Sequence, residues 1–168
     1  MFRFSFLLLF CFILVSACQK ISEEPVILNN GAENSSAIIA SSISVANVVV
    51  ATQNGTVRYN VEIANTPEVR EKGLQHREHL DVDWGMWFEF EEDSQNPFWM
   101  KNTPLSLDIL FINSDFKVVD IAANAEPNSE ELIVSASPFR YVLEVGAGQA
   151  SENSVNIGDA VELRLGPQ

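Results

Sequence analysis

Residues that carry redox, metal or nucleic-acid chemistry are scarce in this sequence. Its 168 residues include 2 cysteines, 2 histidines and 10 Lys and Arg against 23 Asp and Glu, giving a formal net charge of −13. A surface with this excess of negative charge repels phosphate backbones, so we expect no nucleic-acid partner. The sequence also lacks a glycine-rich phosphate loop, a dinucleotide fingerprint and a Gly-x-Ser-x-Gly motif. We therefore expect neither a cofactor nor a serine hydrolase.

Both cysteines lie within the first 18 residues. Arg3 precedes an apolar run from Phe4 to Val15, and the small residues Ser16 and Ala17 follow. This order is typical of a signal peptide. The run is shorter than the roughly 20 residues that a membrane-spanning helix needs, and polar residues come after it. We therefore expect a removable signal peptide over residues 1–17, with a retained membrane helix as the weaker alternative.

The segment Val15-Ser16-Ala17-Cys18 resembles the lipobox of bacterial lipoproteins. The resemblance implies that Cys18 is lipidated and becomes the first residue of the mature chain. An ordinary secretory signal with a cysteine at the cleavage point is the alternative. Gln19 follows, whereas an aspartate there usually retains a lipoprotein in the inner membrane, so we expect anchorage on the periplasmic face of the outer membrane. The mature chain would then hold no free thiol, which excludes disulfide scaffolds and cysteine nucleophiles.

Composition divides the rest of the chain into a tether and one domain. Residues 18–44 are rich in Ser, Asn, Glu and Ala with few apolar side chains, which is typical of a flexible tether. Residues 45–168 are enough for a single domain with one hydrophobic core.

The domain opens with signals for a β-hairpin and a short helix. Residues 45–52 are rich in β-branched side chains, and apolar and polar residues alternate over 57–63. The turn signal Asn54-Gly55 lies between these two strands. Thr66 and Pro67 then supply a helix N-cap and first residue, and Gly73 ends the helix after about two turns.

The remainder of the domain is dominated by short apolar runs. Strand-like segments occur at 85–90, 98–102, 107–113, 116–122, 132–135, 141–145 and 160–165, with a tight turn at 113–115 and a second short helix around 149–153. This spacing predicts a mainly β fold, a compact antiparallel barrel or sandwich-like domain with one or two short helices. We expect the acidic run from Glu89 to Asp93 to form a solvated loop rather than a calcium site.

Several motifs, in order along the chain, resemble a prokaryotic family. Trp99-Met100-Lys101-Asn102-Thr103 and Leu107-Asp108-Ile109 resemble the core signature of domain of unknown function 192 (DUF192), also called uncharacterised protein family 0127. Thr66-Pro67-Glu68, Gly85-Met86 and Tyr141-Val142-Leu143-Glu144-Val145 fall in the family's order. The resemblance covers roughly residues 57–163 and implies a compact, usually exported β-rich domain, without implying an activity. The sequence departs from the family pattern at Gln75, where many relatives have methionine, and at Leu105-Ser106, where an Ile-Pro pair is frequent.

Aromatic and polar residues of these motifs suggest a small-ligand site. In a strand over 98–102, Trp99 and Lys101 would project from one face, where aromatic packing and convergent polar groups could form a pocket. We hypothesise that six residues line one cleft: Arg77, Trp99, Lys101, Asn102, Asp108 and Glu144. The alternative is structural, with Trp99 in the core, Lys101 paired with Asp108 or Glu144, and Asn102 fixing a turn before Pro104.

The two histidines do not predict a metal site. His76 and His79 are three residues apart, and no third ligand follows in a metal-binding pattern. Asp108 and Glu144 could perform proton chemistry, but the sequence does not place them within reach of each other. We therefore lean against an enzyme.

Together these features predict an envelope lipoprotein whose domain binds a small ligand or serves as an accessory domain facing the periplasm. One alternative is an assembly adaptor that binds an envelope protein, which an exposed apolar patch would indicate. The other is an enzyme that uses clustered Lys, Asp and Glu groups. The expected partners are the membrane, through the lipid anchor, and either a small molecule or an envelope protein.

Overall fold

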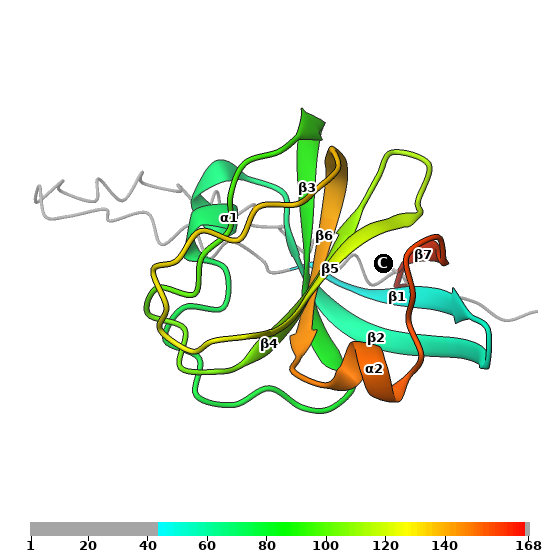
Figure 1. Ribbon diagram of the computed structural model, residues 1–168, viewed down its shortest axis with the longest axis horizontal. Helices are drawn as coiled ribbons and strands as arrows, with labels where there is room; N and C mark the ends of the chain where they lie inside the picture. Colours follow the sequence, from blue (N-terminus) through cyan, green and yellow to red (C-terminus); the bar gives the residue numbers. More distant parts are fainter. Residues whose placement is uncertain (1–43, 167–168) are drawn as a thin grey trace, which may run out of the picture. The chain divides into compact units, whose positions relative to one another are not determined.

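The computed structural model describes residues 44–166. The signal peptide expected at 1–17, the lipidated Cys18 and all of the expected tether except Ser44 lie outside these residues. In the described part of the chain, seven strands form one sheet and two short helices accompany it (Figure 1): β1 Val45–Thr52, β2 Gly55–Ala64, α1 Pro67–Lys72, β3 Trp84–Ser94, β4 Leu107–Ile112, β5 Val118–Ala125, β6 Phe139–Gly146, α2 Gln149–Glu152 and β7 Ala160–Leu165.

The predicted first hairpin is confirmed. β1 and β2 pair in antiparallel fashion from Val45 opposite Glu62 to Thr52 opposite Gly55. Gly55 has a φ of 131°, a backbone conformation that glycine adopts without steric cost. The turn chemistry therefore fixes the register of the hairpin.

The predicted first helix is confirmed with its caps. The Thr66 hydroxyl accepts a hydrogen bond from the Val69 N–H at 3.4 Å, and Pro67 is the first helical residue. Gly73, with a φ of 47°, donates its N–H to the Val69 carbonyl and ends the helix. These local signals place α1 directly after β2 in the chain.

The sheet is mixed and open. Its strand order is β5-β4-β6-β3-β2-β1-β7, and every pair is antiparallel except β2 with β3. Next to the edge strands β5 and β7, Lys117, which precedes β5, and Ala160 of β7 form one isolated bridge. The mainly β prediction with short helices is confirmed, but a closed barrel is excluded because that one bridge does not continue into a ladder.

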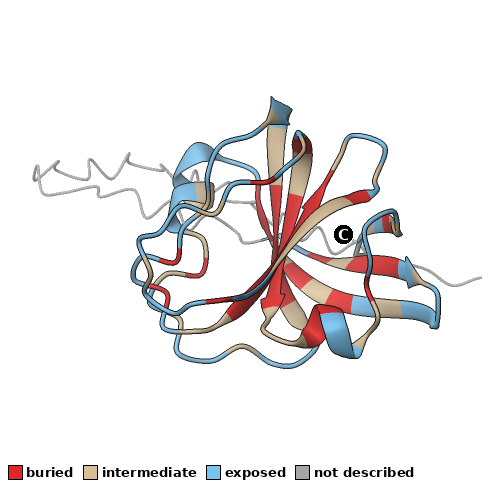
Figure 2. Ribbon diagram, in the orientation of Figure 1, coloured by how far each residue is buried: buried red, intermediate tan, exposed pale blue. Residues whose placement is uncertain are grey.

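The two faces of the sheet pack against two clusters of buried side chains (Figure 2). Alternate residues of a strand point to opposite faces, so Leu143 and Val145 of β6 join one cluster while Val142 joins the other. The second cluster is covered by α1 and by the β3–β4 and β5–β6 connections, which contribute Val69, Phe98 and Ile133. This covered side contains the candidate site.

Two sequence predictions about the connections are wrong. Residues 98–102 and 132–135 are not strands, since they share only one bridge, between Phe98 and Ile133. Asn102, at φ 56°, turns the chain, and this reversal prevents a longer strand.

The acidic run expected to form a loop also differs from the prediction. Residues up to Ser94 continue β3. Arg70 pairs with Glu91 at 3.3 Å, and Arg140 pairs with Asp93 at 3.0 Å. These two arginines are distant in the sequence and offset part of the negative charge of the acidic run. That charge was the reason for predicting a solvated loop.

Candidate functional site

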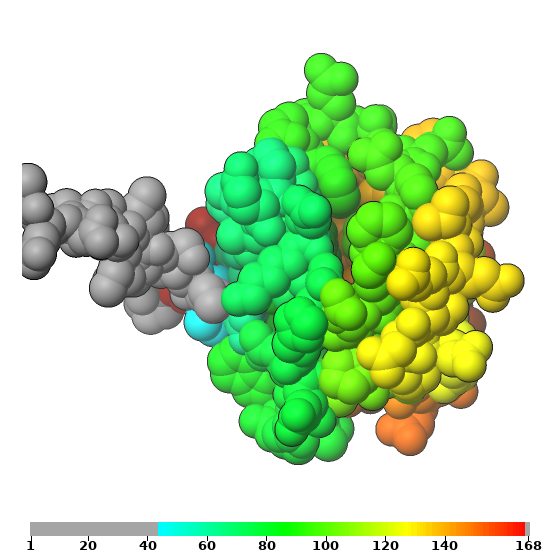
Figure 3. Space-filling view, turned by 90° about the vertical axis from the view of Figure 1, so that its left-hand side faces the viewer, coloured from blue at the N-terminus to red at the C-terminus, as the bar shows by residue number. Residues whose placement is uncertain are grey.

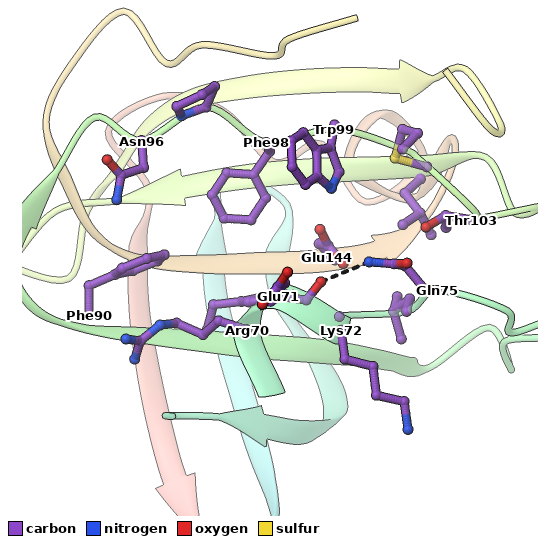
Figure 4. Close-up of a pocket in the computed structure, with 16 residues that line it drawn as sticks. Arg70, Glu71, Lys72, Gln75, Phe90, Asn96, Phe98, Trp99, Thr103 and Glu144 are labelled. Atoms are coloured by element: carbon purple, nitrogen blue, oxygen red, sulfur yellow. Dashed lines mark hydrogen bonds between the residues drawn. The ribbon is translucent and has the colours of Figure 1, made fainter. Parts of the chain in front are cut away.

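A cavity of about 190 Å³ lies on the second face of the sheet. One wall is α1 with the turn after it, the opposite wall is the 96–103 segment, and β3, β4 and β6 supply the floor (Figure 4). Figure 3 looks onto this side of the domain, where the two walls face each other across a hollow. The lining residues are Arg70, Glu71, Lys72, Gly73, Leu74, Gln75, Phe88, Phe90, Asn96, Pro97, Phe98, Trp99, Met100, Thr103, Leu107 and Glu144.

Glu144 is a buried carboxylate on the floor of this cavity. It follows Val142 on the same face of β6 and is 6% exposed. Burial raises the pKa of the Glu144 carboxyl from 4.5 to about 8, and within residues 44–166 no hydrogen bond or positive group offsets that effect. No fully enclosed side-chain oxygen or nitrogen lacks a partner in this part of the chain, so the unpartnered Glu144 oxygens reach the cavity.

Gly85 allows the floor to form around Glu144. A Cβ atom at Gly85 would lie 2.3 Å from the Glu144 carbonyl oxygen, closer than atoms of this kind can approach. The glycine of the Gly85-Met86 motif therefore lets β3 pair closely with β6 at the residue that carries the carboxylate.

Four aromatic rings contribute to the apolar lining: Phe88, Phe90, Phe98 and Trp99. Phe98 packs edge-on against Phe88, with ring centroids 5.6 Å apart, and against Phe90 at 6.4 Å. Trp99 is 48% exposed beside them, at the mouth of the cavity. The Phe98 N–H and carbonyl both bond to Ile133, at 2.9 and 2.8 Å, which holds the aromatic wall in place.

The polar groups at the rim are largely engaged with one another. Arg70 lies with its guanidinium carbon 5.0 Å from the Phe90 ring centre, donates to the Glu89 carbonyl at 2.6 Å and pairs with Glu91. Gln75 donates to the Glu71 carbonyl at 2.8 Å. The rim is therefore largely organised before any ligand arrives.

Two of the six predicted site residues, Trp99 and Glu144, line this cavity. Asn102 lies outside the lining, but its amide donates to Gln75 at 3.2 Å and its carbonyl accepts from the His76 N–H at 2.7 Å. Asn102 thus ties the two walls together.

The other three candidates have partners elsewhere. Arg77 makes a two-point ion pair with Glu62, at 2.6 and 2.8 Å. The Lys101 ammonium nitrogen lies 3.4 Å from a carboxylate oxygen of Glu130 and is not paired with Asp108 or Glu144. Lys101 is directed away because the chain turns at 100–103 instead of extending as a strand. The structure therefore does not bring the six residues into one cleft.

Asp108 lies on the opposite face of the sheet from Glu144. Its two oxygens accept hydrogen bonds from the Asn124 and Ala150 N–H groups, both at 2.8 Å. Ala150 belongs to α2, so Asp108 ties β4 to both β5 and the second helix. Its side chain is fully buried, and its role in this arrangement is structural.

Sequence reasoning did not include several residues that shape the cavity. Arg70, Phe90, Phe98 and Gln75 line it, yet they come from α1, the turn after it, β3 and the β3–β4 connection. Arg70 lies two residues after the Thr66-Pro67-Glu68 motif and could have been included. The placement of Phe90 and Phe98 depends on pairing between distant segments.

Residues 44–166 contain no group of three His, Cys, Asp or Glu side chains arranged to hold a metal ion. His79 instead contacts Asp81 at 2.8 Å. Over the same range, no helix is long and apolar enough to cross a membrane.

Comparison with known proteins assigns the family. The family model DUF192, described as "Uncharacterized ACR", matches residues 49–163. The chain belongs to the DUF192 family. Among curated proteins no significant match was found.

Two crystal structures resemble this DUF192 domain. A protein of Sinorhizobium meliloti 1021, described as a candidate transcription regulator, is 42% identical, with a TM-score of 0.70 over 73% of this chain and 95% of its own. A protein of unknown function from Novosphingobium aromaticivorans DSM 12444 is 35% identical, with a TM-score of 0.71 over 74% of this chain and 89% of its own. Both similarities extend over most of those chains.

Proposed function

We propose that this DUF192 domain is a small-ligand-binding module. The observation that carries the proposal is the buried Glu144 carboxylate, unpartnered within residues 44–166, at the base of a cavity with aromatic walls. Ligand sites combine an apolar lining with a few polar groups that fix orientation, and this cavity has that composition. A buried polar group without a hydrogen-bond partner costs free energy. A ligand that forms a hydrogen bond with Glu144 would remove that cost, which would favour its binding.

We further propose that the domain is exported and held by lipid on the periplasmic face of the outer membrane. The support is the sequence alone, in the signal-peptide layout of residues 1–17 and the lipobox resemblance at Cys18. Metabolic labelling of cells with a radioactive fatty acid would label the wild-type chain, but not a Cys18→Ser variant. Equal labelling of both would contradict the proposal.

Transcription regulation, suggested by the description of the Sinorhizobium protein, is a less favourable proposal. A formal net charge of −13 repels DNA. A small ligand in the cavity requires no such partner.

Native mass spectrometry of the full chain purified from cells tests ligand binding. We expect a defined extra mass that is absent from a Trp99→Ala variant and retained by a Val82→Ala control. Val82 is an exposed apolar residue outside the cavity lining. A wild-type protein without the extra mass would overturn the small-ligand proposal.

A protein-binding adaptor is the second candidate, and one observation favours it. Leu132 and Val134 are 58% and 61% exposed, and they flank Ile133, which bridges to Phe98 beside the exposed Trp99. Exposed apolar side chains of this kind are typical of protein contacts. Photo-cross-linking from position 132 in cells would capture one partner reproducibly if the adaptor function is correct.

A further inference from the structure

We propose that the ligand of this cavity is a small organic cation, an ammonium group on an aromatic or aliphatic body, whose charge pairs with the Glu144 carboxylate. This inference rests on the proposed ligand-binding function and names its ligand class.

The charge balance of the site supports a cation. Two other acidic side chains in this part of the domain have a basic partner, Glu62 with Arg77 and Glu91 with Arg70. Glu144 has none among the described residues and is more deeply buried than these. A buried carboxylate is stabilised by a close positive group that also donates hydrogen bonds, and an ammonium ligand would supply both.

The cations already present cannot fill this role. The charged lining side chains besides Glu144 all come from α1: Arg70, Glu71 and Lys72. Arg70 is held at the rim by the Glu89 carbonyl and Glu91, and Lys72 points away from the cavity centre (Figure 4). The 96–103 wall, β3 and β4 contribute no charged lining residue, so the space above Glu144 faces aromatic and neutral groups.

The aromatic wall suits the same ligand. Arg70 already lies over the Phe90 ring, so this set of aromatic rings accepts a cation at its rim. Trp99, at the mouth, offers the aromatic ring type that attracts cations most strongly. A volume of about 190 Å³ is below the roughly 300–1,000 Å³ typical of ligand pockets, which limits the ligand body to about one ring or a short chain.

An anionic ligand fits these observations less well. Its charge would meet Glu71 in one wall and, once the pH exceeds the Glu144 pKa of about 8, the ionised Glu144 on the floor, while Arg70 is already neutralised by Glu91. The net charge of −13 adds a general preference for cations in solution.

Calorimetric titration of the full chain with three single-ring probes tests the inference. The probes are benzylamine, which is largely cationic up to pH 8.5, neutral benzyl alcohol and anionic benzoate. We expect benzylamine to bind at least tenfold more tightly than either of the others at pH 8.5. Its affinity should fall roughly tenfold for each unit by which the pH drops below about 8, because the ammonium group selects the ionised form of Glu144 and that form becomes scarcer as the pH falls.

Two matched glutamine variants locate the effect. Glu144→Gln keeps the shape of the side chain and should lose at least tenfold in benzylamine affinity, together with the pH dependence. Glu92→Gln, at an exposed position of β3, should bind like the wild type. Near-ultraviolet circular dichroism of both variants would verify that each is folded.

The outcomes separate this inference from the proposed function. Benzyl alcohol or benzoate binding as tightly as benzylamine would overturn the cation class and leave a ligand-binding cavity. Benzylamine affinity that does not change between pH 6 and 8.5, or that survives Glu144→Gln, would also overturn it. If benzylamine fails to bind and native mass spectrometry finds no ligand, both the inference and the proposed function are wrong.

Discussion

Replacing Glu144 by glutamine should remove the contribution of this carboxyl to the pH dependence of stability. An acid whose pKa is higher in the folded state than in the unfolded state holds its proton better when folded. Its contribution to stability is fully present below the unfolded pKa and is lost as pH rises through the folded pKa. For Glu144 these values are 4.5 and about 8, so the loss falls in that pH window.

The expected magnitude follows from the same two values. At about 1.4 kcal/mol for each pH unit between them, Glu144 destabilises the domain at high pH by about 5 kcal/mol relative to low pH, with about 4 kcal/mol of this lost between pH 5 and pH 8.5. Folded domains are typically stable by about 5–15 kcal/mol, so such a loss is readily measured.

Urea unfolding of the purified protein at a series of pH values is the assay. The free energy of unfolding of the wild type, minus that of Glu144→Gln, should fall by about 4 kcal/mol from pH 5 to pH 8.5. With a typical urea m-value of about 2 kcal/mol/M, this corresponds to about 2 M in the relative midpoint. Contributions that the two proteins share cancel in the difference.

A Glu92→Gln variant serves as the control, since this side chain is exposed. Its difference from the wild type should stay constant across the range. If the Glu144→Gln difference were equally constant, burial would not be raising the pKa of the Glu144 carboxyl. The conclusion that this carboxyl is desolvated at the base of the cavity would then be refuted.

Three further substitutions test the architecture around the cavity by denaturant unfolding. Asp108→Ala should cost about 2–4 kcal/mol, because it leaves the buried Ala150 N–H without its acceptor; a loss under 0.5 kcal/mol would contradict the structural role. Gly85→Ala should cost about 1–3 kcal/mol or more through the clash of its Cβ with the β6 backbone, and native-like stability would show that the two strands are not so close. A double-mutant cycle on Arg77 and Glu62 should give about 1 kcal/mol of coupling from their two-point contact, whereas additive effects would mean that the pair is open in solution.

The elements predicted correctly from sequence are those specified by neighbouring residues. The β1–β2 hairpin follows from Asn54-Gly55, and α1 follows from Thr66, Pro67 and Gly73. The strand prediction for 98–102 failed because its apolar residues, the partly buried Phe98 and the buried Met100, lie in a connection that contains a turn. Apolar composition alone does not distinguish that from a strand.

The candidate site was predicted only in part, for a similar reason. Trp99 and Glu144 were selected from motifs, but the sequence did not show that Asp108 and Glu144 face opposite sides of the sheet, because that depends on strand order and register. Whether Glu144 has a hydrogen-bond or ion-pair partner depends on side chains that are distant in the sequence and close in space. No local pattern contains such information.

The parallel pairing of β2 with β3 has an evolutionary consequence. Parallel neighbours cannot be joined by a tight turn and require a crossover connection, so the chain between Ala64 and Trp84 must travel back along the sheet, and it carries α1 on the way. One cavity wall belongs to this obligatory detour and the other to the β3–β4 connection. Because connections tolerate change better than paired strands do, descendants of one ancestral fold could diverge in what they recognise while inheriting the same floor.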